Sequence, residues 1–386
     1  MLEKALHGSK IYWAWVMALL GVIGIGFFTY LYQYSQGLGV TGLSRDVSWG
    51  FYIAQLTYLV GVAASGVMLV LPYYLHDHKT FGKLTILGEF MAVSAVLMCM
   101  MFVLVDLGQP KRMLNVILFP TPNSILFWDM FVLSGYLGLN IVIGWMVLHA
   151  ENKRGELAKW VKILIYISIP WAISIHTVTA FLYSGLPGRH FWLTAILAPR
   201  FLASAFCAGP AILLLIMFVM RKVANFHVPD KAVNTLSVII TYAMILNVFF
   251  LLLEMFTAFY SNIPGHLHAF EYMFVGSHGK WAMAPWMWTS VLLGVFSLVL
   301  LIVPKWRKNP KTFVVALITL VASTWIEKGM ALVVVGFIPN PLDQVTEYTP
   351  TLPELTISLG VYAVGLLVLT LLFKIALGVR AETANA

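Results

Sequence analysis

The chain has 386 residues, of which 60% are hydrophobic and only 10% are charged. A soluble globular domain carries roughly 25% charged residues, so this composition excludes a soluble enzyme, a disordered tail and a nucleic-acid-binding protein. The formal net charge of +8 is better explained by Lys and Arg residues gathered on one side of a membrane than by a nucleic-acid partner.

Ten apolar runs follow one another along the chain, each of about the 20 residues that a membrane-spanning helix needs. Lys4 and Lys10 precede the first run, as in a signal peptide, but the run is too long for a signal-peptide core and no small-residue cleavage site follows, so we expect a retained helix. The predicted spans are 12–34, 49–75, 84–107, 124–149, 160–184, 199–221, 233–262, 285–304, 312–338 and 354–379. The connections are short, which predicts one polytopic all-α integral membrane domain over residues 1–386.

The charges of the connecting segments predict the orientation. If the N-terminus is cytoplasmic, the inside segments carry 17 Lys and Arg residues, Lys79 and Lys83 among them, and the outside segments carry 6. The six outside residues are Arg45, Lys111, Arg112, Arg189, Arg200 and Lys280. This asymmetry follows the positive-inside rule, so we expect a protein of the cell (inner) membrane with both termini in the cytoplasm.

Two pairs of residues suggest an internal repeat. Gly61 and Gly209 are 148 residues apart, as are Asp106 and Glu254. The spacing would align spans two to five with spans six to nine. It predicts two four-helix bundles plus two extra helices, the alternative being coincidence among many Gly and acidic residues.

Several ionisable side chains lie within the predicted spans, where each costs at least ~2.5–3.5 kcal/mol on insertion scales. They are Glu89 in span three, His176 in span five, Glu254 in span seven, Glu327 and Lys328 in span nine, and Asp106 and Asp129 near the outer ends of spans three and four. The predicted orientation places all of them in the outer half of the membrane except Glu89, which lies near the inner surface. The polar chemistry is therefore expected on the outer side.

Two of these residues are the first members of polar helix faces. His176, Thr179 and Tyr183 are spaced i, i+3 and i+7, which places them on one side of a helix, and the series that begins at Glu254 continues through Thr257 and Ser261. The two faces are expected to enclose a wet or ligand-filled space.

A purely structural role is the alternative for the charged residues. Glu254 with Lys328 is then a buried pair that only fixes helix packing, and Glu89 extends to the inner membrane surface.

The inventory of metal ligands argues against a redox centre in this chain. A membrane haem usually takes two buried His ligands, and only His176 lies well inside a span. Cys99 and Cys207 are too few for an iron–sulfur cluster or a disulfide framework. His266 and His268 lie in an outer loop over 263–284, but a metal site needs more ligands in defined geometry, so we expect this loop to pack on a partner.

The remaining chemistry suits an aromatic ligand with polar oxygens. Trp49, Tyr52, Trp128 and Tyr183 lie in the outer half with the acids and the histidine. Aromatic side chains would pack a quinone ring, while His and carboxylates exchange protons with its carbonyls. The same residues would also suit a stand-alone proton-coupled secondary transporter, and a scaffold that only anchors partners is a third class.

Four motifs in order through spans two to six resemble the NrfD / polysulfide reductase membrane-subunit family. They are Asp46-Val-Ser-Trp49-Gly50-Phe-Tyr52 with Gly61-Val-Ala-Ala-Ser-Gly66; Asp106-Leu-Gly108-Gln-Pro110-Lys-Arg112; Thr121-Pro122-Asn-Ser124 with Trp128-Asp129; and His176-Thr-Val-Thr179-Ala-Phe-Leu-Tyr-Ser184 with Pro199-Arg200-Phe-Leu-Ala-Ser204. The ten-span length is most similar to the family members found in complexes of sulfate reducers.

The resemblance implies a membrane subunit without a redox centre of its own, and without catalytic residues or a metal. Such subunits bind menaquinone near one membrane face and exchange electrons with a ferredoxin-like [4Fe–4S] subunit, while protons pass through the membrane subunit. In the sulfate-reducer complexes the ferredoxin-like protein is extracytoplasmic, and a multihaem cytochrome c and a membrane cytochrome b subunit are expected nearby.

The resemblance assigns quinone-site roles to Trp49, Asp106 and His176, which stand at motif positions. Tyr52 and Asp129 join them because they lie at similar depth. We expect a proton path formed by Glu89, Glu254, Glu327 and Lys328. Inner-half carboxylates are sparse, so proton exchange with the outer side is favoured over a path across the whole membrane.

Overall fold

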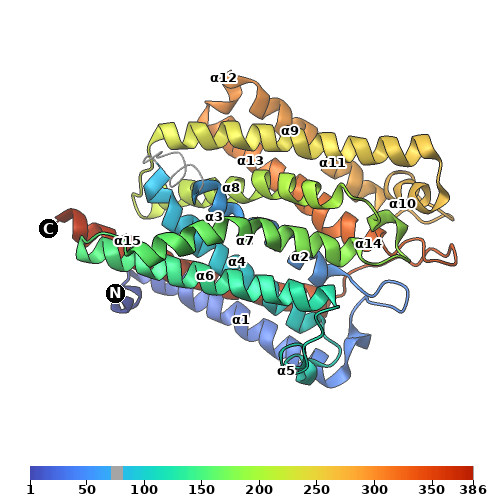
Figure 1. The fold of residues 1–386 in the computed structure, drawn as a ribbon, viewed down its shortest axis with the longest axis horizontal. Helices are drawn as coiled ribbons and strands as arrows, with labels where there is room; N and C mark the ends of the chain where they lie inside the picture. Colours follow the sequence, from blue (N-terminus) through green and yellow to red (C-terminus); the bar gives the residue numbers. More distant parts are fainter. Residues whose placement is uncertain (71–80, 386) are drawn as a thin grey trace.

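The computed structural model describes residues 1–70 and 81–385 (Figure 1). Over these residues the chain forms helices and no strands, and nine helices are long and apolar enough to cross a membrane. The protein is therefore an all-α integral membrane protein, as the apolar runs predict.

The long helices lie close to the predicted spans. Their bounds are α1 (Lys10–Gln36), α4 (Gly82–Asp106), α6 (Ile125–Lys153), α7 (Lys159–Ser184), α8 (Leu197–Val223), α9 (Asp230–Ser261), α11 (Ala284–Ile302), α13 (Pro310–Thr324) and α15 (Leu352–Asn385). Short helices lie between them: η1 (Leu2–Leu6), η2 (Leu38–Val40), η5 (Pro110–Arg112), α5 (Asn115–Leu118), η6 (His190–Trp192), α10 (Pro264–Phe274) and α12 (Pro304–Arg307). Helix α10 lies within the segment 263–284, for which the sequence predicts a loop.

The second predicted span is broken. It forms α2 (Phe51–Ala63) and α3 (Ser65–Val70) instead of one helix over 49–75, whose last five residues lie outside the described residues. Glycines bring α3 against α4, because a Cβ on Gly66 would lie 3.3 Å from the carbonyl oxygen of Gly88. The small residues of this span therefore allow close backbone contact, as expected of such residues between membrane helices.

The ninth predicted span changes its helical pitch. Helix α13 continues into a π-helix (η7, Trp325–Ala331), and α14 (Leu332–Val335) completes the span. A π-helix is rare and is frequently found at functional sites. Here it contains the two adjacent charged residues of the span, Glu327 and Lys328.

The helices pack as two groups of four with the same order of neighbours. In the first bundle α4 contacts α2 and α6, and α7 contacts α6 and α2; in the second bundle α9 contacts α8 and α11, and α13 contacts α11 and α8. The extra helices α1 and α15 pack against each other, and α15 also packs on α4. This is the grouping that the 148-residue spacing predicts.

The two bundles meet along α2, α7, α8 and η7, which contact one another across the boundary. Both chain termini lie at one end of the helices, here called the termini end (Figure 1). The opposite end, here called the loop end, carries α5 and α10 (Figure 1). Of the basic residues expected on the inside, Lys79 lies outside the described residues.

Candidate functional site

A polar cluster lies between α2, α6 and α7, in the half of the first bundle nearest the loop end. His176, Thr179 and Tyr183 are all buried on one face of α7, as their spacing predicts. The Thr179 hydroxyl donates to Asp129 Oδ1 of α6 at 2.7 Å, and the Tyr183 hydroxyl is hydrogen-bonded to that of Thr57 on α2. This buried group, here called the His176 cluster, therefore joins three helices.

His176 itself lacks a hydrogen-bond partner. Its side chain is completely buried, and neither ring nitrogen bonds to any atom of the described residues. A buried polar atom without a partner costs about 1–3 kcal/mol. The imidazole is thus available to a ligand or to water.

Three further aromatic rings form a group of four with the Tyr183 ring of this cluster. The Trp49 ring lies 5.5 Å from that of Tyr183, 5.8 Å from that of Trp192 and 5.7 Å from that of Phe337. The Trp192 indole donates to the carbonyl of Leu332 at 2.8 Å, which fixes its orientation. We call the four rings the aromatic box. Trp128 does not join it: its ring is 44% exposed on α6.

Asp106 is the last residue of α4, and Tyr52 lies in the first turn of α2. The Tyr52 hydroxyl donates to Gln33 of α1 at 2.7 Å, and Gln33 donates to the carbonyl of Val105 at 2.7 Å. Asp106 Oδ1 is buried without a partner in the described residues. The Tyr52 hydroxyl therefore faces α1 and not the His176 cluster.

Glu354 is a buried carboxylate that the sequence analysis did not include in the site. It connects the loop that contains Gly42 to the loop that precedes α15. It is completely buried in the first turn of α15. It accepts hydrogen bonds from the backbone of Gly42 at 2.8 Å, from the backbone of Thr351 at 2.8 Å and from the Tyr348 hydroxyl at 2.6 Å. The spacing Thr351-x-x-Glu354 is that of a capping box, a signal in the sequence that points to this structural role.

Asp46, which opens the first motif, ties two loops together at the loop end. Its carboxylate accepts a hydrogen bond from Thr346 at 2.9 Å and from Asn340 at 3.3 Å. These bonds favour the charged form and lower the pKa of Asp46 below its ordinary value. The adjoining Arg189 donates to the Phe337 carbonyl at 3.1 Å and lies 4.5 Å over that ring, which connects the loop to the aromatic box.

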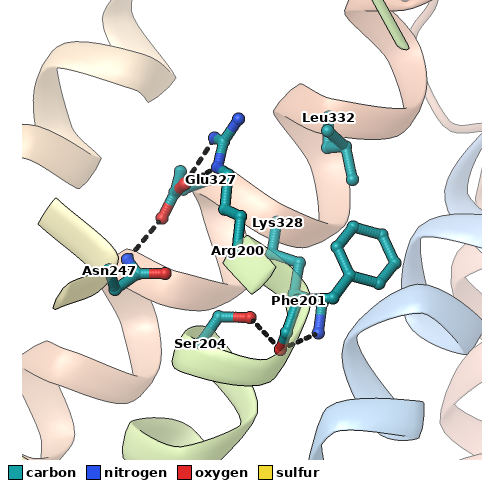
Figure 2. A pocket seen from close by; sticks show the side chains of 7 residues that line it. All are labelled: Arg200, Phe201, Ser204, Asn247, Glu327, Lys328 and Leu332. Carbon is teal, nitrogen blue, oxygen red and sulfur yellow. Dashed lines mark hydrogen bonds and ion pairs between the residues drawn. The ribbon is translucent and has the colours of Figure 1, made fainter. Parts of the chain in front are cut away.

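A second buried cluster lies in the second bundle, and its central residue is Arg200 (Figure 2). Arg200 donates to Glu327 Oε1 through Nε at 3.1 Å and through Nη2 at 2.5 Å, and it forms an ion pair with Glu254. Asn247 donates to the other Glu327 oxygen at 3.1 Å. The cluster therefore connects α8, α9 and the π-helix, and is called the Arg200 cluster below.

This arrangement corrects two expectations. The sequence predicts Arg200 in an outside segment, yet it is 5% exposed within α8. Glu254 pairs with Arg200 and not with Lys328. The guanidinium group of Arg200 has several donors in a planar fork, so it binds two carboxylates from different helices, whereas the ammonium group of a lysine is a point charge.

The predicted polar face that begins at Glu254 and continues through Thr257 and Ser261 does not line a cavity. Thr257 and Ser261 are exposed on α9 and donate to carbonyls of their own helix at 2.9 Å and 2.5 Å. Thr257 and Ser261 therefore do not form the enclosed space that the sequence predicts between two polar faces.

Lys328 points away from the carboxylates. It is 4% exposed, its ammonium group donates to the Phe201 carbonyl at 3.3 Å, and it lies 4.4 Å over the Phe201 ring (Figure 2). A Cβ on Gly61 of α2 would lie 3.1 Å from Lys328 Nζ. The lysine therefore sits where the second bundle meets the first.

Glu89 lies near the termini end of α4 and is buried, with 3% of its surface exposed. It does not extend to the membrane surface. Its Oε2 has no partner in the described residues, and a Cβ on Gly144 of α6 would lie 3.5 Å from it. Glu151 and Arg380 form an ion pair at 2.9 Å between α6 and α15.

Side chains that could hold a metal ion do not gather in the part of the chain that the structure describes. That part contains no group of three His, Cys, Asp or Glu side chains placed to bind an ion. His266 lies on α10 with its ring 6.3 Å from that of His190. Burial, together with the charge of His190, lowers the pKa of His266. Both cysteines are buried and free.

Three proteins similar to this chain are all named as membrane subunits of reductases or oxidoreductases. A putative membrane subunit of the dimethyl sulfoxide reductase of Halobacterium salinarum is 25% identical over 92% of this chain and 88% of its own. The Hdr-like menaquinol oxidoreductase integral membrane subunit of Archaeoglobus fulgidus is 23% identical over 80% and 74%. The menaquinone reductase integral membrane subunit of Nitratidesulfovibrio vulgaris is 23% identical over 93% and 90%.

The family model for polysulphide reductase, NrfD, matches residues 39–338. That range contains both bundles, the aromatic box, the His176 cluster and the Arg200 cluster, and it leaves out α1 and α15. The chain belongs to the NrfD polysulphide reductase family.

Proposed function

We propose that this protein is the menaquinone-binding membrane subunit of a respiratory electron-transfer complex, and that quinone binds at the His176 cluster beneath the aromatic box. The observation that carries the proposal is the completely buried His176, whose two ring nitrogens have no partner in the described residues. Two of the relatives are named for menaquinol or menaquinone, which supports the ligand class.

The residues of the cluster fit such a ligand. A quinone needs a flat apolar surface for its ring and polar groups for its two carbonyl oxygens. Trp49 and Tyr183 offer the first. A neutral imidazole both donates and accepts hydrogen bonds, so His176 suits either redox form of the ligand, and Asp106 Oδ1 is a second open polar atom. When bound, the quinone supplies the two-electron chemistry that this chain lacks.

The carboxylates then serve proton exchange. Asp129 is connected to the α7 face through Thr179, and Asp106 lies at the end of α4 nearest the loop end. Both are placed to take up or release the protons that accompany quinone reduction or oxidation. Trp49 and Tyr52 shape the site, Tyr52 by holding Gln33 against α4.

The same proposal includes the orientation and the partners. Basic residues gather at the termini end, which favours cytoplasmic termini in the cell (inner) membrane, and the loop end is then extracytoplasmic. An extracytoplasmic ferredoxin-like [4Fe–4S] subunit would exchange electrons with the quinone there. The complex also includes a multihaem cytochrome c and a membrane cytochrome b subunit, as in sulfate reduction.

Proton movement is proposed to involve Glu254, Glu327 and Lys328 in the second bundle, with exchange toward the loop end. The termini half offers Glu89 as its buried carboxylate among the described residues, and Glu89 Oε2 has no partner there. A path through Glu89 across the whole membrane is the competing version.

The test uses the purified complex and a menaquinol analogue. His176→Ala and Asp106→Asn are expected to lower quinol-dependent electron transfer by about 10²-fold, the usual contribution of a positioned proton-transfer group, while the complex still assembles. The matched controls are His227→Ala and Asp230→Asn, which change exposed residues at the termini end. Unchanged activity in both site variants would refute the site, and a wild-type complex indifferent to quinol would refute the function and favour a stand-alone transporter.

A further inference from the structure

A cavity lies at the surface of the protein where the two bundles meet. Its volume is about 270 Å³, less than the roughly 300–1,000 Å³ of a pocket for a whole drug-sized ligand. The lining comes from the end of α7 in the first bundle, from the segment that follows η6 and from the start of α8 in the second bundle: Phe181, Ser184, Leu193, Thr194, Ala195 and Ala198. The cavity therefore suits one part of a larger molecule.

Two walls of the cavity continue into the aromatic box. Ser184 directly follows Tyr183 on α7, and Leu193 directly follows Trp192 at the end of η6. The rings of Tyr183 and Trp192 are completely buried, and their centroids lie 5.0 Å apart. Because an α-helix rises only 1.5 Å per residue, Ser184 stands at nearly the same depth as Tyr183, which belongs to the His176 cluster.

The wall formed by α8 leads to the same tyrosine. Ala198 lies in the first turn of α8, three residues before Phe201, so the two side chains share one side of the helix. The centroid of the Phe201 ring lies 6.0 Å from that of the Tyr183 ring. The cavity therefore adjoins the proposed quinone site along both α7 and α8.

The lining of the cavity suits a hydrocarbon chain. None of the described residues that line it is charged, and its two hydroxyl groups are engaged with the backbone. Ser184 donates to the carbonyl of Ala180 at 3.2 Å, and the Thr194 hydroxyl oxygen accepts from the backbone N–H of Ile196 at 3.3 Å. Burying a polar group without a hydrogen-bond partner is costly, so an apolar occupant is favoured over a polar one.

The rim of the cavity is apolar and exposed. Phe181 is 50% exposed on α7, and Leu193 is 42% exposed. Because α7 is long and apolar enough to cross a membrane, an apolar ring exposed on it faces lipid. Small side chains, Ala195 and Ala198, leave the space between these two larger ones. A chain that occupies the cavity can therefore continue into the bilayer.

We propose that this cavity binds the isoprenoid tail of the quinone whose ring binds at the His176 cluster, and that the tail leaves the protein between α7 and α8. A lipid acyl chain has similar chemistry, but the direct continuity of the cavity with Tyr183 and Trp192 favours the tail. This inference rests on the proposed quinone function and adds to it the recognition of the tail.

The first experiment fills the cavity. Electron transfer by the purified complex is measured with a menaquinol that carries several isoprene units and with a quinol of the same ring that has no tail. We expect Ala198→Phe to raise the KM for the tailed quinol by about tenfold, the lower limit for a hydrophobic pocket that loses room for a methylene. Its kcat, and both constants for the tail-free quinol, should stay unchanged.

Two further variants accompany this one. Ala195→Phe changes an exposed residue of the lining, so it can be accommodated in the fold, and it should raise the same KM by a smaller factor. Ala18→Phe is the matched control, because it makes the same change at an exposed position on α1 and should leave both quinols unaffected.

The second experiment locates the tail in the wild-type complex. A menaquinone with a photoreactive diazirine in its first isoprene units is irradiated in the complex, and the labelled peptides are identified by mass spectrometry. We expect the label within residues 181–198. A photoreactive phospholipid that labels this segment when the quinone does not would assign the cavity to an acyl chain and overturn the inference.

Several results would contradict the tail site. Wild-type KM values for the tailed quinol in both Ala198→Phe and Ala195→Phe would overturn it, as would an equal rise for the tailed and the tail-free quinol, which would assign the effect to the ring. If Ala198→Phe does not assemble, labelling of the wild-type complex decides. A wild-type complex that oxidises neither quinol would refute the proposed function, whereas oxidation of both without label in residues 181–198 would refute only the tail site.

Discussion

Replacing Arg200 by Met should destabilise the protein strongly. Arg200 makes two buried hydrogen bonds to Glu327, at 3.1 Å and 2.5 Å, and an ion pair with Glu254, whose side chain is 9% exposed. Removing one partner of a buried ion pair costs about 3–5 kcal/mol, because the charge left behind is uncompensated. The variant leaves two carboxylates, of which Glu327 keeps a donor in Asn247 at 3.1 Å, so the cost should lie within that range.

The assay is thermal unfolding in detergent, followed by the loss of monodisperse protein. At about 2 °C per kcal/mol, Arg200→Met should lower the melting temperature by about 6–10 °C. The matched control is Arg112→Met, which makes the same change at an exposed position in η5 and should shift stability by less than about 0.5 kcal/mol.

A compensating variant separates charge from packing. Adding Glu254→Gln and Glu327→Gln to Arg200→Met removes the two uncompensated charges and should recover most of the lost melting temperature. Melting temperatures that are equal for Arg200→Met and wild type would refute the account of the Arg200 cluster. If the triple variant is no more stable than Arg200→Met alone, the loss of melting temperature is caused by packing and not by charge.

Three further predictions concern other parts of the molecule. Asp46→Asn should remove a part of the stability that depends on pH. The pKa of Asp46 is lowered in the folded protein, so its contribution to stability is present above the ordinary value of 3.8 and is lost as pH falls through the lower folded value. Melting curves of the variant and of wild type between pH 3 and 7 would detect this difference. Gly336→Ala would drive a Cβ into the Trp192 ring and should cost about 1–3 kcal/mol by overpacking, measured by thermal unfolding, whereas Gly138→Ala, with no atom within 4 Å, should not destabilise. Glu89→Gln should leave any membrane potential generated in liposomes intact if proton exchange occurs only at the loop end; loss of the potential with retained electron transfer would establish the inward path instead.

The membrane spans could be predicted because each long helix coincides with an apolar run. Helix α6, for example, begins at Ile125 and ends at Lys153, close to the predicted 124–149. The break of the second span after Ala63 could not be predicted, because the apolar run continues through it. Hydropathy indicates the position and length of a membrane span but not a break within it.

The His176 face was predictable and the Arg200 cluster was not. Three polar residues at i, i+3 and i+7 define a face on any helix, and the structure buries all three. Arg200 stands at the start of an apolar run, where a cation ordinarily marks a membrane surface. Charge balance was the available signal: Glu254 and Glu327 are two buried acids with one neighbouring lysine, and a second cation was needed.

The direction of Lys328 also lay beyond sequence reasoning. On a regular α-helix, neighbouring residues point about 100° apart, but their partners depend on the helices around them and here also on the π-helix. The role of Glu354 was likewise hard to predict, although Thr351-x-x-Glu354 is a recognisable capping box. Glu354 lies at the start of a span, and of its two further partners Gly42 is distant in the sequence and Tyr348 lies in a loop.

The most direct test of the central claim is to extract and quantify quinone from the purified complex. The account predicts close to one menaquinone for each copy of this chain in the wild-type protein, and a clear loss in His176→Ala at unchanged assembly, while His227→Ala retains it. Wild-type protein without bound quinone that also fails to bind a menaquinol analogue would contradict the account, as would a His176→Ala variant that retains the full amount.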